Sequence, residues 1–373
     1  MNIGLSENKE AWNAAVLGLD GTLYHSWEWG EIRARQGWHP WRVMVQEGGG
    51  PCAAAQIFER HFRVAGYSLL YAACGIAGNS STPEIVSALA VWMRRFAAER
   101  NAILLRIETR FDHSDAARKS LLCSAGFRPI EDQWSLWNLP RATMVIDIRG
   151  SEEQLLKKMR KKHREHINRA TRNGLKITAT NGIDQLRWFY DLLLKSSERQ
   201  GFAVRDFDYF LQVREQLITA SRGSLFMALM NNHPVAGILC ARFGSTCHYL
   251  YGGFDWQARQ AYANEALHWA AIQWSRNLGC VNYDMVGAGT SYPPAEGNAG
   301  FGLYNFKKGF GADLFYSAGY FDLVSKPVLY SALRLAERHT GWVSAARGLR
   351  SAMRRVSRAS NDSRKSSGGS AEA

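Results

Sequence analysis

The chain has 373 residues, of which 46% are hydrophobic and 21% charged, so it is long enough to bury a large core in two domains. Its six cysteines are scattered without any metal-ligand spacing, which argues against a zinc site or a disulfide framework and favours a reducing cytoplasm. The formal net charge of +13 favours an anionic partner such as nucleic acid, a phosphorylated substrate or acidic lipid, and we find neither a signal-peptide pattern nor an apolar run long enough to span a membrane.

The first half predicts helices alternating with short strands. Ser26 is a suitable N-cap for a helix that ends near Gly37, and two strand-like runs, 41–46 and 52–60, are joined by a glycine-rich turn. A short strand at 68–72 precedes a helix that Pro83 opens and that continues to about residue 100. An apolar strand at 103–108 and a helix at 116–125 complete the first half.

The second half repeats this order of elements. One long helix is predicted from Ser151 to about Asn173, and two more helices at 183–200 and 209–221 follow it. Further on come strands at 224–230, 235–243 and 247–252, a tryptophan-containing helix at 263–277, and a strand at 281–286. This duplicated order predicts an α/β (α+β) protein of two similar domains, each a mixed sheet flanked by helices.

We place the first domain at residues 1–145, completed by 314–325, and the second at 146–313. Residues 326–356 form a predicted basic amphipathic helix, which suits either the anionic inner face of a membrane or docking on the first domain. Residues 357–373 have almost no apolar surface and are predicted to be disordered.

Two adjacent lysines stand in an unusual setting in the sequence GLYNFKKGFG, residues 302–311. The aromatic residues around them need burial and the glycines permit tight turns, so at least one ammonium is expected at a shaped site. If the segment is extended, Lys307 and Lys308 point to opposite sides. A salt bridge from Lys307 to Asp284 or Asp313 is the alternative.

The motif VNYDMVG at 281–287, followed by GLYNFKKGFG, resembles the Fem-type aminoacyltransferases (the FemABX family). SWEWGEIR at 26–33, RATRNG at 169–174 and GFAVRDFDYF at 201–210 support the resemblance, which covers residues 20–325. The chain has no long helical insertion, so it is similar to the compact members. The resemblance implies two tandem domains of the GNAT (acyl-CoA N-acyltransferase) fold. It also implies transfer of an amino acid from aminoacyl-tRNA to the side-chain amine of a peptidoglycan precursor's stem peptide, which forms an interpeptide bridge.

The same resemblance assigns roles to individual residues. Lys307, directly after Phe306, would stabilise the oxyanion of the aminolysis reaction. The substrate-binding residues that it implies, mainly a basic clamp for the precursor's diphosphate, are Arg33, Arg205, Tyr209, Tyr251 and Tyr304, and guanidinium groups suit phosphate oxygens. From the residues alone, Glu108 is a further candidate, because a carboxylate at a strand end can orient an amine or accept its proton.

The expected partners are aminoacyl-tRNA and a UDP-linked or lipid-linked peptidoglycan precursor, and we expect a cytoplasmic monomer with peripheral membrane contact. The basic stretch from Lys157 to Lys176 is a candidate for contacts with the tRNA backbone. No cofactor is expected, with aminoacyl-tRNA as the donor substrate. No metal is expected either, because His163 and His166 lack further ligands nearby.

Three alternatives stay open at this point. An acyl-CoA-dependent N-acyltransferase of the same fold needs a glycine-rich turn before a helix, but RQAYAN at 259–264 has no glycine and CGIAG at 74–78 is a poor match. A non-catalytic RNA-binding protein would use the charge alone. The same chemistry on a different amine acceptor is the third.

Overall fold

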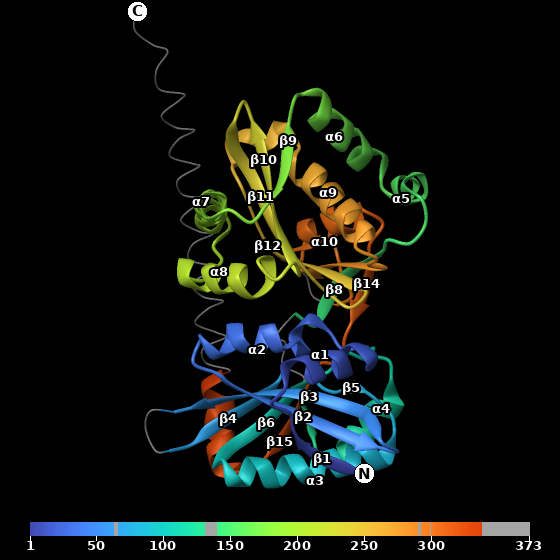
Figure 1. The fold of residues 1–373 in the computed structure, drawn as a ribbon, viewed down its shortest axis with the longest axis vertical. Coiled ribbons are helices and arrows are strands. Elements are labelled where there is room, and N and C mark those ends of the chain that lie inside the picture. Colours follow the sequence, from blue (N-terminus) through green and yellow to red (C-terminus); the bar gives the residue numbers. More distant parts are fainter. Residues whose placement is uncertain (63–65, 131–139, 290–291, 299, 338–373) are drawn as a thin grey trace, which may run out of the picture.

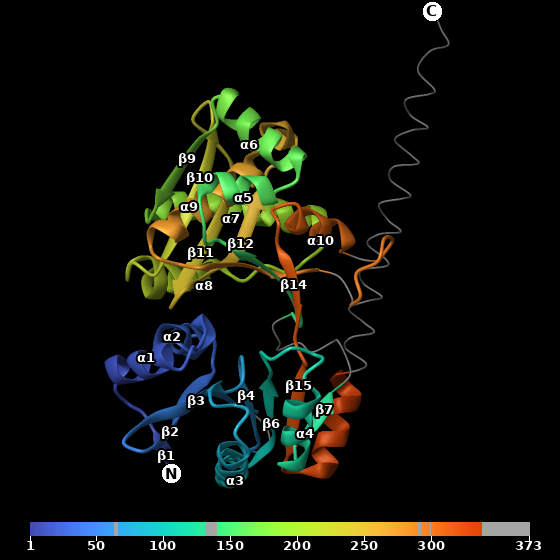
Figure 2. The ribbon, with the colours of Figure 1, turned by 90° about the vertical axis from the view of Figure 1, so that its right-hand side faces the viewer.

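The computed structural model describes residues 1–337 except 63–65, 131–139, 290–291 and 299, and this part of the chain forms two β-sheets in two lobes (Figures 1 and 2). Each sheet contains one parallel strand pair, β4 with β6 and β12 with β13, among otherwise antiparallel neighbours. Helices cover both faces of each sheet. The fold is therefore mixed α/β, as predicted.

The first sheet has the strand order β1-β2-β3-β4-β6-β15-β7, with β5 beside β3. All seven residues of β6 are buried, as expected for an apolar strand at the centre of a sheet. The strands are β1 (Asn2–Leu5), β2 (His39–Glu47), β3 (Gly50–His61), β4 (Ser68–Ala72), β5 (Ala77–Gly78), β6 (Ala102–Glu108), β7 (Arg128–Ile130) and β15 (Tyr320–Val324). The accompanying helices are α1 (Lys9–Gly18), η1 (Leu23–His25), α2 (Trp27–Ala34), α3 (Pro83–Glu99) and α4 (Ala116–Ser124).

The second sheet has the order β14-β8-β13-β12-β11-β10-β9. Its strands are β8 (Ala142–Asp147), β9 (Lys176–Thr180), β10 (Gly223–Met230), β11 (His233–Phe243), β12 (Thr246–Phe254), β13 (Asn282–Gly287) and β14 (Asp313–Tyr316). The helices are α5 (Glu152–Lys158), α6 (Lys161–Arg172), α7 (Ile183–Gln200), α8 (Phe207–Val213), the π-helical η2 (Arg214–Ile218), η3 (Trp256–Ala261), α9 (Ala263–Asn277) and α10 (Phe301–Lys308). In Figure 1, α7 and α8 lie on one side of this sheet and α6, α9 and α10 on the other.

The two domains share part of their hydrophobic core. One buried cluster joins Trp12, Leu23 and Ile32 of the first domain to side chains of α7, α8, η2, β10 and β11, including Phe189 and Leu217. The interface is thus apolar and packed like a protein interior, so it fixes α1 and α2 against the second domain. This packing places the functional side chains of both domains at one junction.

The structure corrects several predicted boundaries. The second sheet takes β8 from Ala142 and β14 at Asp313–Tyr316, so the second domain begins before residue 146 and the return to the first sheet follows Tyr316 instead of starting at 314. The helix predicted from Ser151 to Asn173 is two helices. Met159 has an extended backbone and ends α5, and Arg160 is the N-cap of α6.

The first part of the predicted C-terminal helix packs on the first domain. Residues 327–337 are helical, and Leu329, Tyr330 and Leu333 pack against a cluster that includes Ile103. Glu337 pairs with the buried Arg106, 2.9 Å away. Residues 338–356 and the predicted disordered tail lie outside the described residues. Among the helices that are described, none has the length and apolarity that crossing a membrane demands.

Candidate functional site

The ammonium group of Lys307 is buried where α10 meets the end of β13. Its side chain is only 3% exposed, and Nζ donates hydrogen bonds to the backbone carbonyls of Met285 and Gly287, both at 2.6 Å. The carbonyl of Val286 lies 3.4 Å from Nζ. Lys307 therefore sits at a shaped site, held by carbonyl oxygens and not by the salt bridge considered as the alternative.

The end of β13 is distorted to present these carbonyls. The pairing of β13 with β8 shifts register between Asp284 and Gly287, and Val286 has a φ of +56°. A β-branched residue in the left-handed region is strained by about 1–3 kcal/mol. Such strain persists only where the surroundings enforce it, and here it turns successive carbonyl groups toward Lys307.

Burial lowers the pKa of Lys307 to about 8, while the negative charge of Asp284 opposes this shift. The group is therefore still mainly an ammonium at neutral pH. Two of its three N–H bonds are used in short hydrogen bonds, and the third has only the distant Val286 carbonyl. That third N–H can turn to an oxyanion forming beside it.

The lysine pair is asymmetric, but it lies on a helix and not on the extended segment considered from the sequence. Successive helix residues differ by about 100° in direction, so Lys307 points inward while Lys308 is exposed above the ring of Tyr304. Phe306 packs against Phe310 and His268 and orients the end of the helix. Tyr304 contacts Phe301 and Lys308, and no described contact brings it to the other predicted substrate-binding residues.

Asp284 directly precedes residues 285–287, whose carbonyls surround the Lys307 ammonium, and its side chain contacts both domains. Its side chain accepts hydrogen bonds from the Thr143 hydroxyl and from the Val286 backbone N–H, and it lies 3.5 Å from the Arg110 guanidinium of the first domain. The ring of His248 is 2% exposed, and its Nδ1 lies 3.4 Å from Asp284 without the geometry of a hydrogen bond. Burial alone would raise the pKa of Asp284, but these neighbours hold it below its ordinary value.

Glu108 ends β6 on the first-domain side of this junction. It is 2% exposed and accepts a 2.5 Å hydrogen bond from the hydroxyl of Tyr71. Burial, followed by the charge of Glu108, raises the pKa of Tyr71 well above its ordinary value, so the tyrosine stays a donor. The geometry makes Glu108 part of a buried polar network and does not present it openly to a substrate amine.

Arg33 of the first domain and Arg205 of the second lie near enough across the domain junction for their charges to interact. The Arg33 guanidinium stacks over Trp38 at 5.0 Å and donates to Gln36, and Arg205 lies 5.8 Å from the ring of Tyr209. Burial lowers the pKa of Arg33, and the charge of Arg205 lowers it further. Within the described part of the chain, neither guanidinium has a carboxylate within ion-pair distance, so both charges are available to an anion.

Two tyrosines complete this second group. The hydroxyl of Tyr251, on β12, donates to that of Tyr209, on α8, at 2.9 Å. Tyr71, Tyr209 and Tyr251 all lie near Arg33. The structure therefore brings together four of the five predicted substrate-binding residues, from three separated segments of the chain.

A row of polar residues lies between this group and Lys307. Tyr71 donates to Glu108, and the charges of Asp284 and Glu108 both act on Arg110. Asp284 in turn accepts from the backbone N–H of Val286, whose carbonyl is one of the three around the ammonium. Beside this row lies a cavity of about 220 Å³, lined by Arg110, the 74–78 turn and α4 residues. A guanidinium that faces a cavity can bind an anionic or carbonyl group of a ligand.

The two histidines of α6 each lie against another helix of the second domain. The ring of His163 is directed toward α10, where its Nε2 lies 3.0 Å from the Phe306 carbonyl oxygen. His166 pairs with Glu265 at 2.7 Å. Across the described ranges, no three His, Cys, Asp or Glu side chains are grouped so as to hold a metal ion.

Sequence reasoning missed Arg110, His248 and Tyr71. Arg110 is two residues after Glu108, and His248 is three residues before Tyr251. The only sign in the sequence that these two residues belong to the site was that each stands near a predicted site residue. Asp284 stood inside a recognised motif, but only as an alternative partner of Lys307. Its junction role depends on Arg110, which is 174 residues away in the chain.

Comparisons with known proteins agree with this architecture. Residues 157–307 match the family described as acetyltransferase (GNAT) domain. The chain is 22% identical over 377 residues to the lipid II:glycine glycyltransferase of Staphylococcus epidermidis ATCC 35984, which covers 83% of this chain and 90% of that protein. The protein of the same name from Staphylococcus aureus USA300 is also 22% identical, over 84% and 90%.

Solved structures show the same fold. The crystal structure of FemX matches with a TM-score of 0.82 at 20% identity, covering 89% of this chain and 99% of that one. A tandem GNAT protein from the clavulanic acid biosynthesis pathway matches with a TM-score of 0.54 at 9% identity, covering 87% and 98%. The predicted resemblance and the predicted fold of two GNAT-like domains are confirmed.

Proposed function

We propose that this chain, a relative of the Fem-type transferases, transfers an amino acid from aminoacyl-tRNA to the side-chain amine of a peptidoglycan precursor. The observation that carries the proposal is the buried Lys307 ammonium at the domain junction that also holds the guanidinium groups of Arg33 and Arg205, neither of which has an ion-pair partner among the described residues. The relatives named above are lipid II:glycine glycyltransferases, so glycine is the first donor residue to test.

The reaction is aminolysis of an ester. The acceptor amine attacks the ester carbonyl carbon and forms the new C–N bond, and the carbonyl oxygen becomes an oxyanion. The third N–H of Lys307 donates to this oxyanion, in a site that excludes most water. The C–O bond to the tRNA ribose then breaks, and a proton lost by the amine ends on the leaving ribose oxygen.

The acceptor is held by its diphosphate. Arg33 and Arg205 supply two planar, permanently charged groups without competing carboxylates among the described residues. The Tyr209 and Tyr251 hydroxyls adjoin them and add hydrogen-bonding capacity. Both the UDP-linked and the lipid-linked precursor contain this diphosphate.

The donor RNA lies along the basic surface of α5, α6 and the start of β9. Eight cations between 157 and 176 are exposed: Lys157, Lys158, Arg160, Lys161, Lys162, Arg169, Arg172 and Lys176. Arg160 donates to Asn305 at 2.8 Å, which fixes α6 to the helix that carries Lys307. Residues 152–180, all of which the structure describes, expose no large apolar side chain of the kind that inserts into a membrane. The partner of this surface is therefore an RNA backbone and not a lipid surface.

No cofactor is needed for this chemistry, because the donor ester is already activated. The turn before α9, where an acyl-CoA enzyme needs glycines, has Tyr262 in the left-handed conformation instead. We further propose that the protein is cytoplasmic and meets a lipid-linked acceptor at the inner face of the membrane. The basic C-terminal segment supplies charge for that contact, although its described part packs on the first domain.

The test combines the purified chain with charged tRNAs and, in turn, with the UDP-linked and the lipid-linked precursor. The expected product is a precursor heavier by one amino acid residue, detected by mass spectrometry. Parallel reactions with acyl-CoA donors test the rival reaction. Transfer from acyl-CoA without transfer from aminoacyl-tRNA would overturn the proposal, and RNA binding without any transfer would support the non-catalytic alternative.

A further inference from the structure

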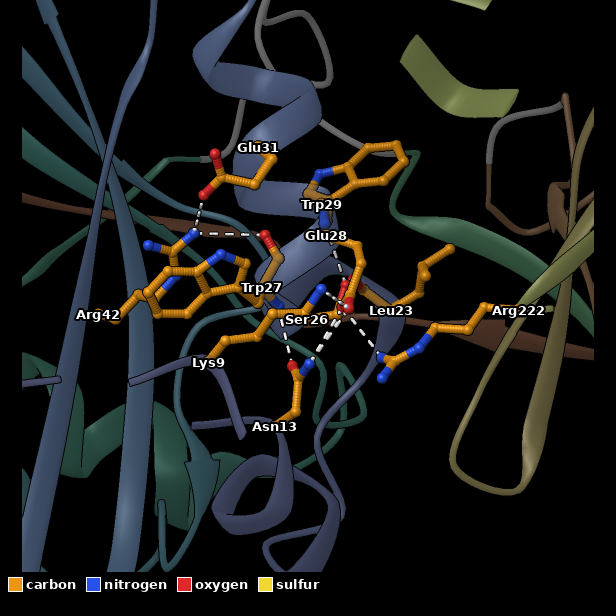
Figure 3. Close-up of polar contacts among 10 residues, drawn as sticks. All are labelled: Lys9, Asn13, Leu23, Ser26, Trp27, Glu28, Trp29, Glu31, Arg42 and Arg222. Carbon is orange, nitrogen blue, oxygen red and sulfur yellow. Dashed lines mark hydrogen bonds and ion pairs between the residues drawn. The ribbon is translucent and has the colours of Figure 1, made fainter. Parts of the chain in front are cut away.

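A buried carboxylate on α2 forms an ion pair between the domains. Glu28 is 1% exposed, and Arg222, which directly precedes β10 in the second domain, donates to it at 2.9 Å. Figure 3 shows Glu28 between Arg222 on one side and Lys9 and Asn13 on the other. Lys9 lies 3.0 Å away and the Asn13 amide 3.1 Å away, and both belong to the first domain.

The two ends of this ion pair are firmly held. The backbone carbonyl of Arg222 accepts from the Arg242 N–H at 2.6 Å, which ties the arginine to the second sheet. On the other side, Arg42 of β2 stacks on Trp27 at 3.4 Å and donates to Glu31 at 2.8 Å, so α2 is also fixed to the first sheet (Figure 3). The α2 helix is thus held from both domains at once.

The same helix carries Arg33. Arg33 is five positions after Glu28, about 7.5 Å along the helix, so a shift of α2 relative to the second domain moves the Arg33 guanidinium relative to Arg205. A diphosphate bound between two guanidinium groups is sensitive to their separation, because bidentate hydrogen bonds need donor–acceptor distances of about 2.7–3.2 Å.

We infer that the Glu28–Arg222 pair is a positioning device that sets the separation of Arg33 and Arg205 and so the fit of the acceptor's diphosphate. The inference rests on the proposed function for its substrate. The pair touches no substrate itself and acts through α2. Its loss does not open the shared core, because the apolar cluster around Ile32 and Leu217 remains.

The kinetic experiment compares Arg222→Met with Lys9→Met. Each removes one cation from Glu28 and leaves the carboxylate two partners, and the two cations are similarly accessible, 30% and 43% exposed. Arg222→Met is expected to raise KM for the UDP-linked precursor about tenfold with kcat nearly kept, whereas KM for the isolated stem peptide, which lacks the diphosphate, stays unchanged. Lys9→Met is expected to change neither.

A distance measurement tests the same inference without activity. Spin labels on the native exposed Cys123 of α4 and on a Glu198→Cys substitution in α7, in a Cys52→Ser background, report the inter-domain distance. We expect a broader distribution of label distances in Arg222→Met than in Lys9→Met. We expect Arg222→Lys, which keeps a cation, to show a smaller rise in KM and a smaller broadening than Arg222→Met.

The outcomes separate the two proposals. If the unmodified chain transfers nothing but the distance distribution broadens only in Arg222→Met, the proposed function fails and the positioning role stands. Equal behaviour of the two methionine variants, an unchanged distribution, or an equal rise in KM for the peptide without diphosphate would overturn the positioning role. If Arg222→Met does not fold, Arg222→Gln, which also removes the cation, decides by the same criteria.

Discussion

Replacing Lys307 by methionine removes a buried ammonium while keeping a side chain of similar length. The methionine sulfur and methyl group fit beside the Tyr249 ring, which lies 5.6 Å from Nζ. The backbone carbonyls of Met285 and Gly287 lose their 2.6 Å donor. The substitution therefore tests the charge at the site with little change in packing volume.

The expected loss of rate is larger than the expected loss of stability. Removing one preorganised oxyanion donor costs about 10²–10³ in kcat, or roughly 3–4 kcal/mol. Each orphaned carbonyl costs about 1–3 kcal/mol of stability, but deleting a buried ammonium recovers its desolvation cost. We expect kcat to fall at least 100-fold. We expect the free energy of unfolding to decrease by about 2 kcal/mol.

The pH dependence gives an independent signature. Burial lowers the pKa of Lys307 to about 8, so the active ammonium form is lost as pH rises above that value. The wild-type rate should therefore decline on the alkaline side with a midpoint near pH 8. In Lys307→Met, the residual rate should lack this decline, because no ammonium remains to be deprotonated.

The assay follows single-turnover transfer from aminoacyl-tRNA to the precursor, with acceptor binding measured separately by calorimetry. Lys308→Met is the matched control, because Lys308 is exposed on the same helix turn and should lose less than twofold. Equal losses in the two variants would refute the assignment. An alkaline decline retained in Lys307→Met would refute the pH reasoning.

Three further outcomes follow from the described contacts. Arg33→Met and Arg205→Met should each raise KM for diphosphate-containing acceptors by about 10–100-fold, as expected for losing a charged hydrogen bond, and unchanged KM would contradict the clamp. The double variant Lys161→Glu with Lys162→Glu should raise KM for aminoacyl-tRNA. It should also reduce the salt dependence of aminoacyl-tRNA binding by about two phosphate contacts, whereas Arg95→Glu on α3, also an exposed position, should change neither. The pKa of Asp284 is held below its ordinary value of 3.8, so the ionised carboxylate stabilises the fold above pH 3.8 and this contribution is lost as the pH falls further. The free energy of unfolding measured in urea should therefore decrease less on acidification in Asp284→Asn than in the wild type. An equal decrease would count against the junction role.

The local sequence determined most of the secondary structure and the identity of the key lysine. Pro83 and the apolar spacing behind it predicted α3, and Ser26 predicted the start of α2, because caps and periodicity act over a few residues. The break between α5 and α6 was missed, since residues 151–173 read as one continuous amphipathic pattern. The helical state of the Lys307 segment was missed as well, because three glycines within ten residues weaken every helix signal.

What the sequence by itself determined is the set of chemical groups: a lysine framed by aromatic residues, two arginines implied by the family resemblance, and a strand-end carboxylate. Only the tertiary structure decided what these groups do. It buried Lys307 against three carbonyls, and it brought Arg110 to Asp284 and Arg222 to Glu28 across 174 and 194 residues of chain. Burial and long-range pairing set the pKa and availability of each charge, and both depend on how the two domains pack, which local propensity does not encode.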